Sequence, residues 1–324
     1  MTEFPLVSIV TPSYNQAAFL EQTIQSVLSQ DYPAVEYWVM DGGSIDGSLA
    51  IIRAYADQLS GWLSEPDQGQ GDAINKGFRR CRGEVVAWLN SDDVYRPGAV
   101  RRAVAVLQAH PEAGLVYSDV DSIDAQGELF NRMRYDHWQL DDLMSFHMLG
   151  QVSVFFRRSV LEKSGLLDIS YQYLLDHHLW LRMALETRLK YVPGEVWAAA
   201  RMHPGAKNVA QAERFGEEAY CLVEWMQADP RFKPLLDQNR HKVLAGAHRL
   251  NAFYLLDGGY PGKALKAYWR AFWHYPSTVL KDWRRIGYAL LSPLKLSQLP
   301  DQYRARRKQT LNREDTKKTK QSPN

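Results

Sequence analysis

Short apolar runs and amphipathic stretches alternate along the first third of the chain. The apolar runs are rich in β-branched and aromatic residues, which is typical of buried strands, and they occupy residues 6–10, 37–40, 62–64 and 85–89. Between and after them, apolar residues recur at helical spacing over residues 20–28, 49–59, 72–80 and 98–109. Strands that alternate with helices in this way predict a parallel, doubly wound sheet.

The alternation ends near residue 115. Residues 115–117 and 152–156 again have the composition of buried strands, whereas the acidic segment 118–127 is rich in turn formers. A helix is predicted over residues 177–186 and a short strand over residues 189–193. We therefore expect the parallel sheet to be extended into a mixed one.

Beyond about residue 210 the apolar positions show helical spacing only. The pattern predicts three parts: an α/β domain over residues 1–210, a helical region over residues 211–300, and a tail over residues 301–324 that has too few apolar residues to fold. The expected fold is thus α/β, with a mostly parallel mixed sheet and a C-terminal helical appendage.

A formal net charge of +2 conceals an uneven distribution. Residues 263–324 carry 15 Lys or Arg and 4 Asp or Glu, a charge of +11, so residues 1–262 carry 24 against 33, a charge of −9. Aromatic and basic residues are interleaved in the basic part, which is typical of helices that rest on an anionic membrane. A solvated helical appendage or a subunit contact would have the same pattern, while nucleic-acid binding would leave the acidic strand ends without a role, so no nucleic-acid partner is expected.

Two cysteines, Cys81 and Cys221, are far apart and belong to no CxxC motif. This spacing argues against a disulfide framework or a zinc site and fits a reducing cytoplasm. The N-terminus lacks the apolar region of a signal peptide, and no run approaches the roughly 20 apolar residues of a membrane span. We expect a cytoplasmic protein, either soluble or attached peripherally to the inner face of the membrane.

Oxygen-rich loops follow three of the predicted strands, at Thr11–Asn15, Asp41–Ser48 and Asn90–Asp93. In a doubly wound sheet these strand ends lie on one edge, where nucleotides bind. GxGxxG and P-loop motifs are absent from the sequence, so phosphate charge has to be met in another way. The adjacent carboxylates Asp92 and Asp93 suit a hard divalent cation, although an Asp-rich turn that caps the next helix would use the same residues.

Four motifs in succession resemble the signatures of the inverting family 2 glycosyltransferases of the GT-A type. They are Ser8–Asn15, Asp41–Ser48, Asn75–Gly77 and Asn90–Asp93, and the resemblance covers roughly residues 4–205. It implies a Rossmann-like nucleotide-sugar-binding domain that binds a nucleoside diphosphate sugar, commonly a UDP-sugar, together with Mg²⁺ or Mn²⁺. The acceptor would be a glycan or a lipid-linked molecule in the assembly of bacterial surface polysaccharide.

By this resemblance, nucleotide contacts fall on the loops at the strand ends. Asp41 would accept a hydrogen bond from the base, although a turn residue before Gly42 is an alternative role. Ile74 stands where the family commonly has Arg, and Asn90 replaces the first acid of the DxD motif, where it would hydrogen-bond the ribose. The residues assigned to the nucleotide are Thr11, Pro12, Tyr14, Asp41, Asp72, Asn75, Lys76, Asn90 and Ser91.

The resemblance also assigns the metal, the base and the sugar contacts. Asp92 would bind the cation, with Asp93 and His203 as further ligands. Asp176, at the start of a predicted helix, would be the general base that takes a proton from the acceptor hydroxyl, a role compatible with capping that helix. Residues assigned to the donor sugar or acceptor are Gln151, Arg201 and Lys207.

The sequence therefore predicts a metal-dependent, inverting glycosyltransferase. Two alternatives remain open at this stage. Asn90 and Ile74 would also fit a degenerate, non-catalytic nucleotide-sugar-binding subunit of an assembly complex. A sugar nucleotidyltransferase would use a related sheet, but a Gly-rich basic loop does not follow the first predicted strand.

Overall fold

A computed structural model describes residues 4–203, 205 and 211–292 of the chain. It divides into two compact units. The first comprises residues 1–121, 133–143 and 148–201, and the second comprises residues 122–132, 144–147 and 202–324. The basic tail at residues 301–324 lies outside the described residues, so the prediction made for it stays a prediction.

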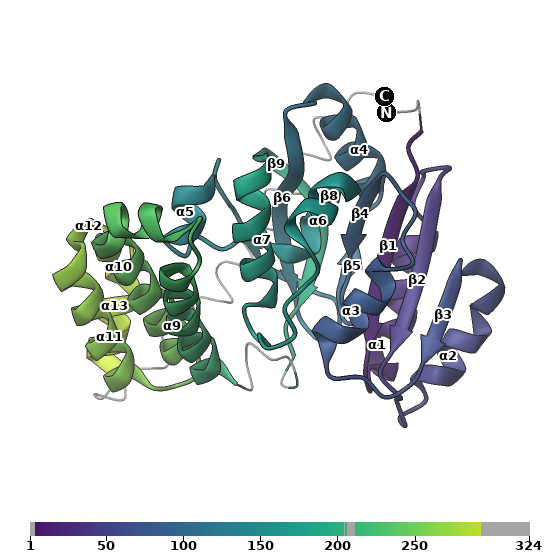
Figure 1. Ribbon diagram of the computed structural model, residues 1–324. Helices are drawn as coiled ribbons and strands as arrows, with labels where there is room; N and C mark the ends of the chain where they lie inside the picture. The colour runs from purple at the N-terminus through teal and green to yellow at the C-terminus, as the bar shows by residue number, and fades with distance from the viewer. Residues whose placement is uncertain (1–3, 204, 206–210, 293–324) are drawn as a thin grey trace, which may run out of the picture. The chain divides into compact units, whose positions relative to one another are not determined.

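The sheet is mixed, and its strands lie side by side in the order β3-β2-β1-β4-β8-β6-β9-β5, with β7 paired to β6 (Figure 1). Its strands belong to the first unit, except residues 122–123 of β6 and 129–132 of β7. The strands are β1 (Val7–Ser13), β2 (Val35–Asp41), β3 (Gly61–Ser64), β4 (Val85–Trp88), β5 (Val94–Tyr95), β6 (Ala113–Ile123), β7 (Leu129–Met133), β8 (Phe155–Arg157) and β9 (Arg188–Arg201). β1 to β4 are parallel, whereas β8 is antiparallel to both β4 and β6. The α/β class, the parallel half and the mixed extension are as predicted.

Helices connect the parallel strands, as the apolar spacing predicts. The helices associated with this unit are α1 (Ala17–Leu28), α2 (Ser48–Ala54), α3 (Gln70–Phe78), α4 (Ala99–Ala109), α5 (Leu140–Met144), α6 (Arg158–Ser164) and α7 (Leu175–Glu186), with short 3₁₀ turns η1 (Ala56–Gln58) and η2 (Gln151–Ser153). Leu20 and Ile24 of α1 are fully buried with Ile9 of β1, because one face of the helix is apolar and has to leave water.

Three predictions for the middle of the chain were wrong in detail. Residues 118–127 were expected to form turns, but β6 continues to Ile123 with every residue buried. The strand expected at residues 152–156 begins later, because residues 151–153 form η2. The short strand expected at residues 189–193 is the first part of β9, which has 14 residues. Polar side chains are buried along β6 because partners satisfy them: Arg96 pairs with Asp121 at 2.7 Å, and Tyr191 donates to Asp119 at 2.5 Å.

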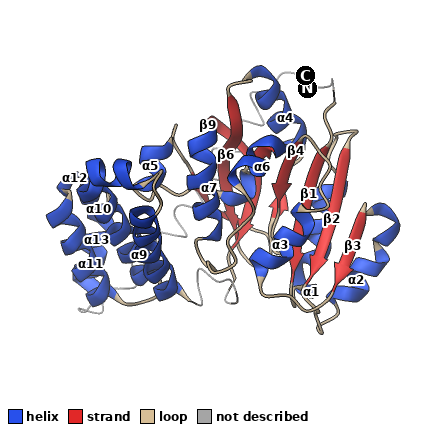
Figure 2. Cartoon of the chain, in the orientation of Figure 1, coloured by secondary structure: helices blue, strands red, loops and turns tan. Residues whose placement is uncertain are grey.

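Among the described residues from 212 onward, helices are the only regular secondary structure of the second unit (Figure 2). They are α9 (Ala212–Ala228), α10 (Lys233–Asp257), α11 (Pro261–His274), α12 (Pro276–Leu280) and α13 (Trp283–Leu291). α11 buries its small residues and Tyr268 in a cluster with Leu255 and Leu256 of α10. None of the helices that the structure describes is long and apolar enough to cross a membrane.

Candidate functional site

The carboxyl ends of β1, β2, β3 and β4 share one edge of the sheet. Ser13 at the end of β1 pairs with Asp41 at the end of β2, and Asp41 pairs with Ser64 at the end of β3. Leu89, just after β4, donates its N–H to Val10 O at 2.9 Å, which places residues 90–93 at the same edge. The oxygen-rich loops are therefore brought together as predicted from the strand order.

Asp41 is buried, and both of its carboxylate oxygens accept hydrogen bonds. Oδ1 accepts from Ser44 Oγ at 2.5 Å, and Oδ2 accepts from Ser64 Oγ at 2.7 Å. Oδ2 also accepts from the backbone N–H groups of Gly43 and Ser44, at 3.2 Å and 3.0 Å. Asp41 thus holds the loop after β2 in its turn, and a contact with a base stays a prediction.

The loop after β1 offers one exposed aromatic ring. Thr11 is fully buried with its hydroxyl 3.0 Å from Tyr37 Oη, and Pro12 is buried too. Tyr14, by contrast, is 62% exposed. Asn15 fixes the loop, because its Oδ1 accepts from Ile45 N at 2.9 Å and its N–H donates to Ser44 Oγ at 2.8 Å. Of the three residues of this loop assigned to the nucleotide, Tyr14 is therefore the one whose ring is exposed for stacking.

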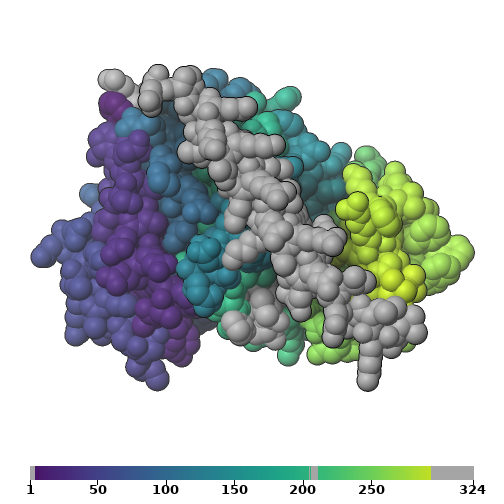
Figure 3. Space-filling view, turned by 180° about the vertical axis from the view of Figure 1, so that it is seen from behind, coloured from purple at the N-terminus to yellow at the C-terminus, as the bar shows by residue number. Residues whose placement is uncertain are grey.

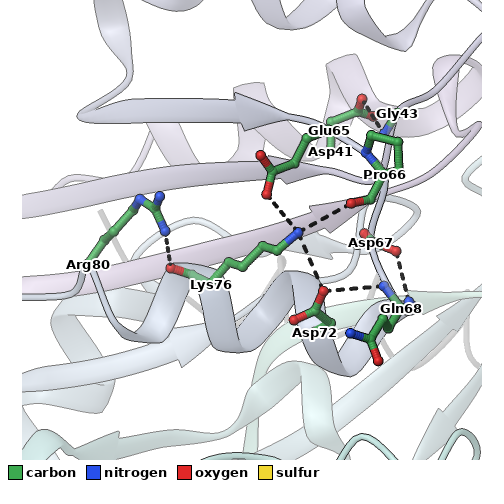
Figure 4. A network of polar contacts seen from close by, with 10 residues as sticks. Asp41, Gly43, Glu65, Pro66, Asp67, Gln68, Asp72, Lys76 and Arg80 are labelled. Carbon is green, nitrogen blue, oxygen red and sulfur yellow. Dashed lines mark hydrogen bonds and ion pairs between the residues drawn. The ribbon is translucent and has the colours of Figure 1, made fainter.

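Lys76 of α3 lies in a network of acidic and carbonyl groups (Figure 4). Its Nζ is 2.9 Å from Glu65 Oε1, 3.4 Å from Asp72 Oδ2 and 3.5 Å from Pro66 O. The hydrogen bond to Glu65 is the main cause that raises the pKa of Lys76, so the side chain stays a cation. In this conformation Lys76 fastens the loop between β3 and α3, and it would have to leave these partners to reach a phosphate.

Asn75, one residue before Lys76, forms two hydrogen bonds with the backbone of Leu167. Its Nδ2 donates to Leu167 O at 2.8 Å and its Oδ1 accepts from Leu167 N at 3.0 Å. Because the side chain is also buried, both ends of the amide serve to join α3 to the segment before α7. A nucleotide contact for Asn75 is untested, and it would compete with this pair.

Asn90 lies at the centre of an amide network. Its Oδ1 accepts from Gln70 Nε2 at 2.7 Å, and its Nδ2 donates to Gln151 Oε1 and Asp93 Oδ2, each at 3.1 Å. Gln151 in turn donates from Nε2 to Trp88 O at 2.8 Å. The residue that departs from the family pattern is thus tied to α3, to η2 and to its own loop, and only an amide supplies both the donor and the acceptor.

Asp92 and Asp93 have different surroundings. Asp93 is 5% exposed, and its Oδ1 accepts from Arg201 N at 2.9 Å while its Oδ2 accepts from Asn90. Burial, and after it the charge of Asp92, raises the pKa of Asp93 well above its usual range. Asp92 is half-buried and lies next to Ser91, which is buried. Of the two carboxylates, Asp92 is therefore the more accessible.

Arg201, at the end of β9, stabilises the loop that carries Asp92. Its Nε donates to Asp92 O at 2.9 Å, its Nη2 donates to Gln22 Oε1 at 2.8 Å, and its guanidinium lies 4.9 Å from the centre of the Phe19 ring. The side chain is 4% exposed. These bonds give Arg201 a positioning role, and the sugar or acceptor contact assigned to it from the sequence stays a prediction.

Asp176 lies in the first turn of α7, whose start is near the same edge. Trp180, one turn further on, stacks on Trp88 of β4 with ring centres 5.1 Å apart, so the helix is fixed against the sheet. A Cβ on Gly69 would come 3.0 Å from Gln172 Oε1, which places the segment before α7 against the start of α3. Asp176 is half-buried, and its Oδ1 accepts from His177 N at 2.7 Å. The capping position itself belongs to Leu174.

Histidines 177 and 178 do not join the site. Both are buried, and His177 Nε2 is 2.9 Å from Leu143 O. His203 belongs to the second unit, and Lys207 lies outside the described residues, so the roles assigned to them stay predictions. Within the part of the chain that the structure describes, no group of three or more His, Cys, Asp or Glu side chains could by itself hold a metal ion.

A divalent cation nevertheless fits the chemistry of this edge. Mg²⁺ is usually held by one or two carboxylates and completed by substrate phosphates and water, so a protein cage of three ligands is not required. Asp92 offers one such carboxylate, on a backbone held by Arg201. A cation held by Asp92 would supply positive charge next to the phosphates of a bound nucleotide.

Several residues of this edge were missed in the sequence. Gln70 is the first residue of α3 and precedes the Asn75–Gly77 motif, but only the structure shows its bond to Asn90. Asp67 comes close to the backbone of Gly42, where an added Cβ would lie 2.5 Å from its Oδ2. Burial is the largest cause that raises the pKa of Asp67, with smaller contributions from Asp72 and Asp41. Gln and Asp are common in loops, so sequence spacing alone does not indicate that Gln70 and Asp67 belong to the site.

Comparison with known proteins gives a consistent result. Residues 8–165 match the family model described as glycosyl transferase family 2. An uncharacterized glycosyltransferase of Mycobacterium tuberculosis is 30% identical over 188 residues, which make up 57% of this chain and 71% of that protein. An uncharacterized glycosyltransferase of Rickettsia typhi is 31% identical over 210 residues, which make up 62% of this chain and 65% of that protein. The chain therefore spans a little under two thirds of the Rickettsia protein.

Other matches are more partial or show the fold alone. The O-antigen biosynthesis protein RfbC of Myxococcus xanthus is 34% identical over 188 residues, which are 56% of this chain but 15% of that protein. The crystal structure of S. aureus TarS 1-349 in complex with UDP-GlcNAc matches with a TM-score of 0.59 and 15% identity, over 86% of this chain and 92% of TarS 1-349. The mannosyltransferase PcManGT from Pyrobaculum calidifontis, in complex with GDP-Man and Mn²⁺, matches with a TM-score of 0.57 and 20% identity, over 91% and 87%.

Proposed function

Because this chain belongs to glycosyl transferase family 2, as its motifs predict, we propose that it transfers a sugar from a nucleoside diphosphate sugar to an acceptor hydroxyl with inversion at the anomeric carbon. The observation that carries the proposal is the shared edge at which Tyr14, Asp41 and Asp92 follow parallel strands. Neighbouring structures with UDP-GlcNAc and GDP-Man support a nucleotide sugar as donor. A UDP-sugar is our first choice.

The donor would lie along the loops of this edge. Tyr14 is exposed and stacks on the base, while the fixed loop around Asp41 forms the wall of the base pocket. Asn90 faces the ribose through an amide already oriented by Gln70 and Gln151. Asp92 holds the cation, Mg²⁺ or Mn²⁺, and the Mn²⁺ of the mannosyltransferase complex supports a metal of this kind.

Asp176 is the general base of the proposed transfer. It takes the proton from the acceptor hydroxyl as that oxygen attacks the anomeric carbon from the side opposite the leaving group. The helix that carries it is fixed by the stack of Trp180 on Trp88, so the carboxylate keeps its position while the donor is bound. A general base contributes about a hundredfold to ten-thousandfold to the rate.

The acceptor is proposed to be a glycan or a lipid-linked molecule of a surface polysaccharide. The O-antigen protein of Myxococcus xanthus supports this class of acceptor. The proposed place of the enzyme is the cytoplasm, with peripheral attachment to the inner face of the membrane through its basic helices. We further propose residues 1–210 as the catalytic domain and residues 211–300 as its helical partner.

A panel of nucleotide sugars, screened by thermal shift with and without Mn²⁺, tests the proposal. Binding of the right donor should raise the melting temperature in a metal-dependent way, and Asp92→Ala should abolish the metal-dependent part. Donor turnover should be measured alongside. Binding without turnover for any donor and acceptor would favour a non-catalytic nucleotide-sugar-binding subunit, a role with which the fully bonded Asn90 is compatible.

A further inference from the structure

Large apolar side chains are exposed on the helices at the end of the described chain. On α11, Trp269 is 60% exposed and Trp273 is 70% exposed, and their rings lie 5.5 Å apart. Trp283, Leu290 and Leu291 of α13 are exposed as well. We call these five residues the aromatic face. Exposure of several indole rings on one helical unit costs free energy in water and indicates a surface that another phase or molecule covers.

The aromatic face is rotated away from the interior of the second unit. The residues of α11 that are buried, Ala264, Ala267, Tyr268 and Ala271, occupy one side of the helix. At 100° per residue, Trp269 and Trp273 fall on the opposite side. α13 buries Ala289 while Trp283 and Leu290 face outward, and its yellow atoms lie at the surface in Figure 3.

Cations accompany the aromatic face. Residues 263–292 contain six Lys or Arg and one Asp, a charge of +5. Lys263 and Arg285 are paired with Glu213 and Asp257, at 2.6 Å each. Four other cations are exposed and form no ion pair within the described residues: Lys266, Arg270, Lys281 and Arg284. Lys266 and Arg270 lie on α11 directly beside the two tryptophans in the helical projection.

We infer that the aromatic face of α11 and α13 is a peripheral membrane-binding surface that takes anionic lipid. Indole rings settle at the level of the headgroups and cations attract the charged leaflet, so the two features together match a bilayer interface. Charge complementarity selects this occupant over a second copy of the chain, because two such faces would bring eight unpaired cations together. This role rests on the proposed function, because the surface would bring the enzyme to a lipid-linked acceptor.

Co-sedimentation of the full chain with vesicles tests the inference. Vesicles of phosphatidylcholine alone are compared with vesicles of phosphatidylcholine and phosphatidylglycerol in equal amounts. Wild-type protein should bind the anionic vesicles, and Trp269→Ala with Trp273→Ala should weaken binding about tenfold or more. The matched aromatic control is Phe4→Ala, which removes an exposed ring from the first unit and should change nothing.

The charge arm uses Lys266→Gln with Arg270→Gln. This pair should weaken binding to anionic vesicles by about tenfold to thirtyfold at low salt and little at high salt. The control pair, Arg53→Gln with Lys163→Gln, removes the same charge from exposed positions of the first unit and should bind like wild type. Far-UV circular dichroism confirms that each variant is folded.

Three results would overturn the inference. Wild-type protein would fail to bind anionic vesicles, or the double variant Trp269→Ala with Trp273→Ala would bind them as wild type does. In the third, a chain truncated after Ser292 would lose all binding, so that binding would depend wholly on residues 293–324. Light scattering measures the oligomeric state. A wild-type dimer that the double variant Trp269→Ala with Trp273→Ala does not form, together with no vesicle binding, would assign the aromatic face to contact with a second copy of the chain. Donor turnover on a soluble acceptor is followed separately. Vesicle binding requires no donor, so a failure here and a failure of the proposed transfer are distinguishable.

Discussion

Asn90→Asp restores the acid that this family usually has in its DxD motif, and we expect it to harm this chain. The substitution exchanges Nδ2, which donates to Asp93 Oδ2 and Gln151 Oε1 at 3.1 Å each, for an oxygen that can only accept. Two hydrogen bonds are lost, and a carboxylate is placed against the buried carboxylate of Asp93.

The magnitude follows from these contacts. Two full charges about 3 Å apart in an effective dielectric of about 20 repel by roughly 5 kcal/mol. The pair would partly avoid this repulsion by holding a proton, because a like charge raises the pKa of each carboxyl group and burial already raises that of Asp93. We expect a net loss of about 2–4 kcal/mol in the free energy of unfolding near pH 8, which includes the unsatisfied acceptor of Gln151.

The loss should depend on pH. A carboxylate whose pKa is raised in the folded state is destabilising at pH values above that pKa, and the cost disappears as pH falls below the unfolded value of about 4. Urea unfolding of the variant at pH 8 and pH 5 measures the difference from wild type at each pH. Asn90→Ala is the control that adds no charge: it removes the same two hydrogen bonds and also the acceptor of Gln70 Nε2, and its cost should depend less on pH than that of Asn90→Asp. An Asn90→Asp variant as stable as wild type at pH 8 would refute this reasoning.

Further predictions follow from other contacts. Tyr14→Ala should weaken the binding of UDP, measured by titration calorimetry, by about tenfold, because one stacked ring is lost. The melting temperature of the variant without nucleotide should be unchanged. Removal of divalent cations with EDTA should stop donor turnover, and added Mn²⁺ should restore it; turnover that continues in EDTA would reject the metal. Burial lowers the pKa of His248 to about 4 from its usual 6.5, so the neutral form stabilises the second unit above pH 6.5 and this stability is lost as pH falls toward 4. Hydrogen exchange in α9–α11 should speed up over that range, and His248→Gln should reduce the dependence; burial also lowers the pKa of His274 of α11, which remains in the variant.

The parallel half of the sheet could be read from the sequence because each strand there contains a short, mostly apolar run. Residues 85–89 and 6–10 are such runs, and β4 and β1 form where they lie. β6 could not be read in the same way, since Asp119 and Asp121 interrupt its apolar pattern. Their burial depends on Tyr191 and Arg96, partners that are distant in the sequence and meet them only in the fold.

The candidate site shows the same division. Motif order placed Asp41 and Asn90 at the ends of strands and Asp176 at the start of a helix, which the structure shows as β2, β4 and α7. The partners of each side chain could not be predicted. Asn75 bonds to Leu167, which is 92 residues away, and Asp93 accepts from Arg201, which is 108 residues away, so both depend on tertiary contacts that no local spacing specifies.

Asp176→Asn gives the most direct test of the proposed transfer. Donor binding and donor turnover are measured on the same protein, by calorimetry with the nucleotide sugar and Mn²⁺ and by release of nucleoside diphosphate in the presence of acceptor. We expect the affinity for donor to stay within about threefold of wild type, because the proposed base acts on the acceptor hydroxyl, and the turnover to fall by about a hundredfold or more. Turnover equal to that of wild type would contradict the assignment of the base.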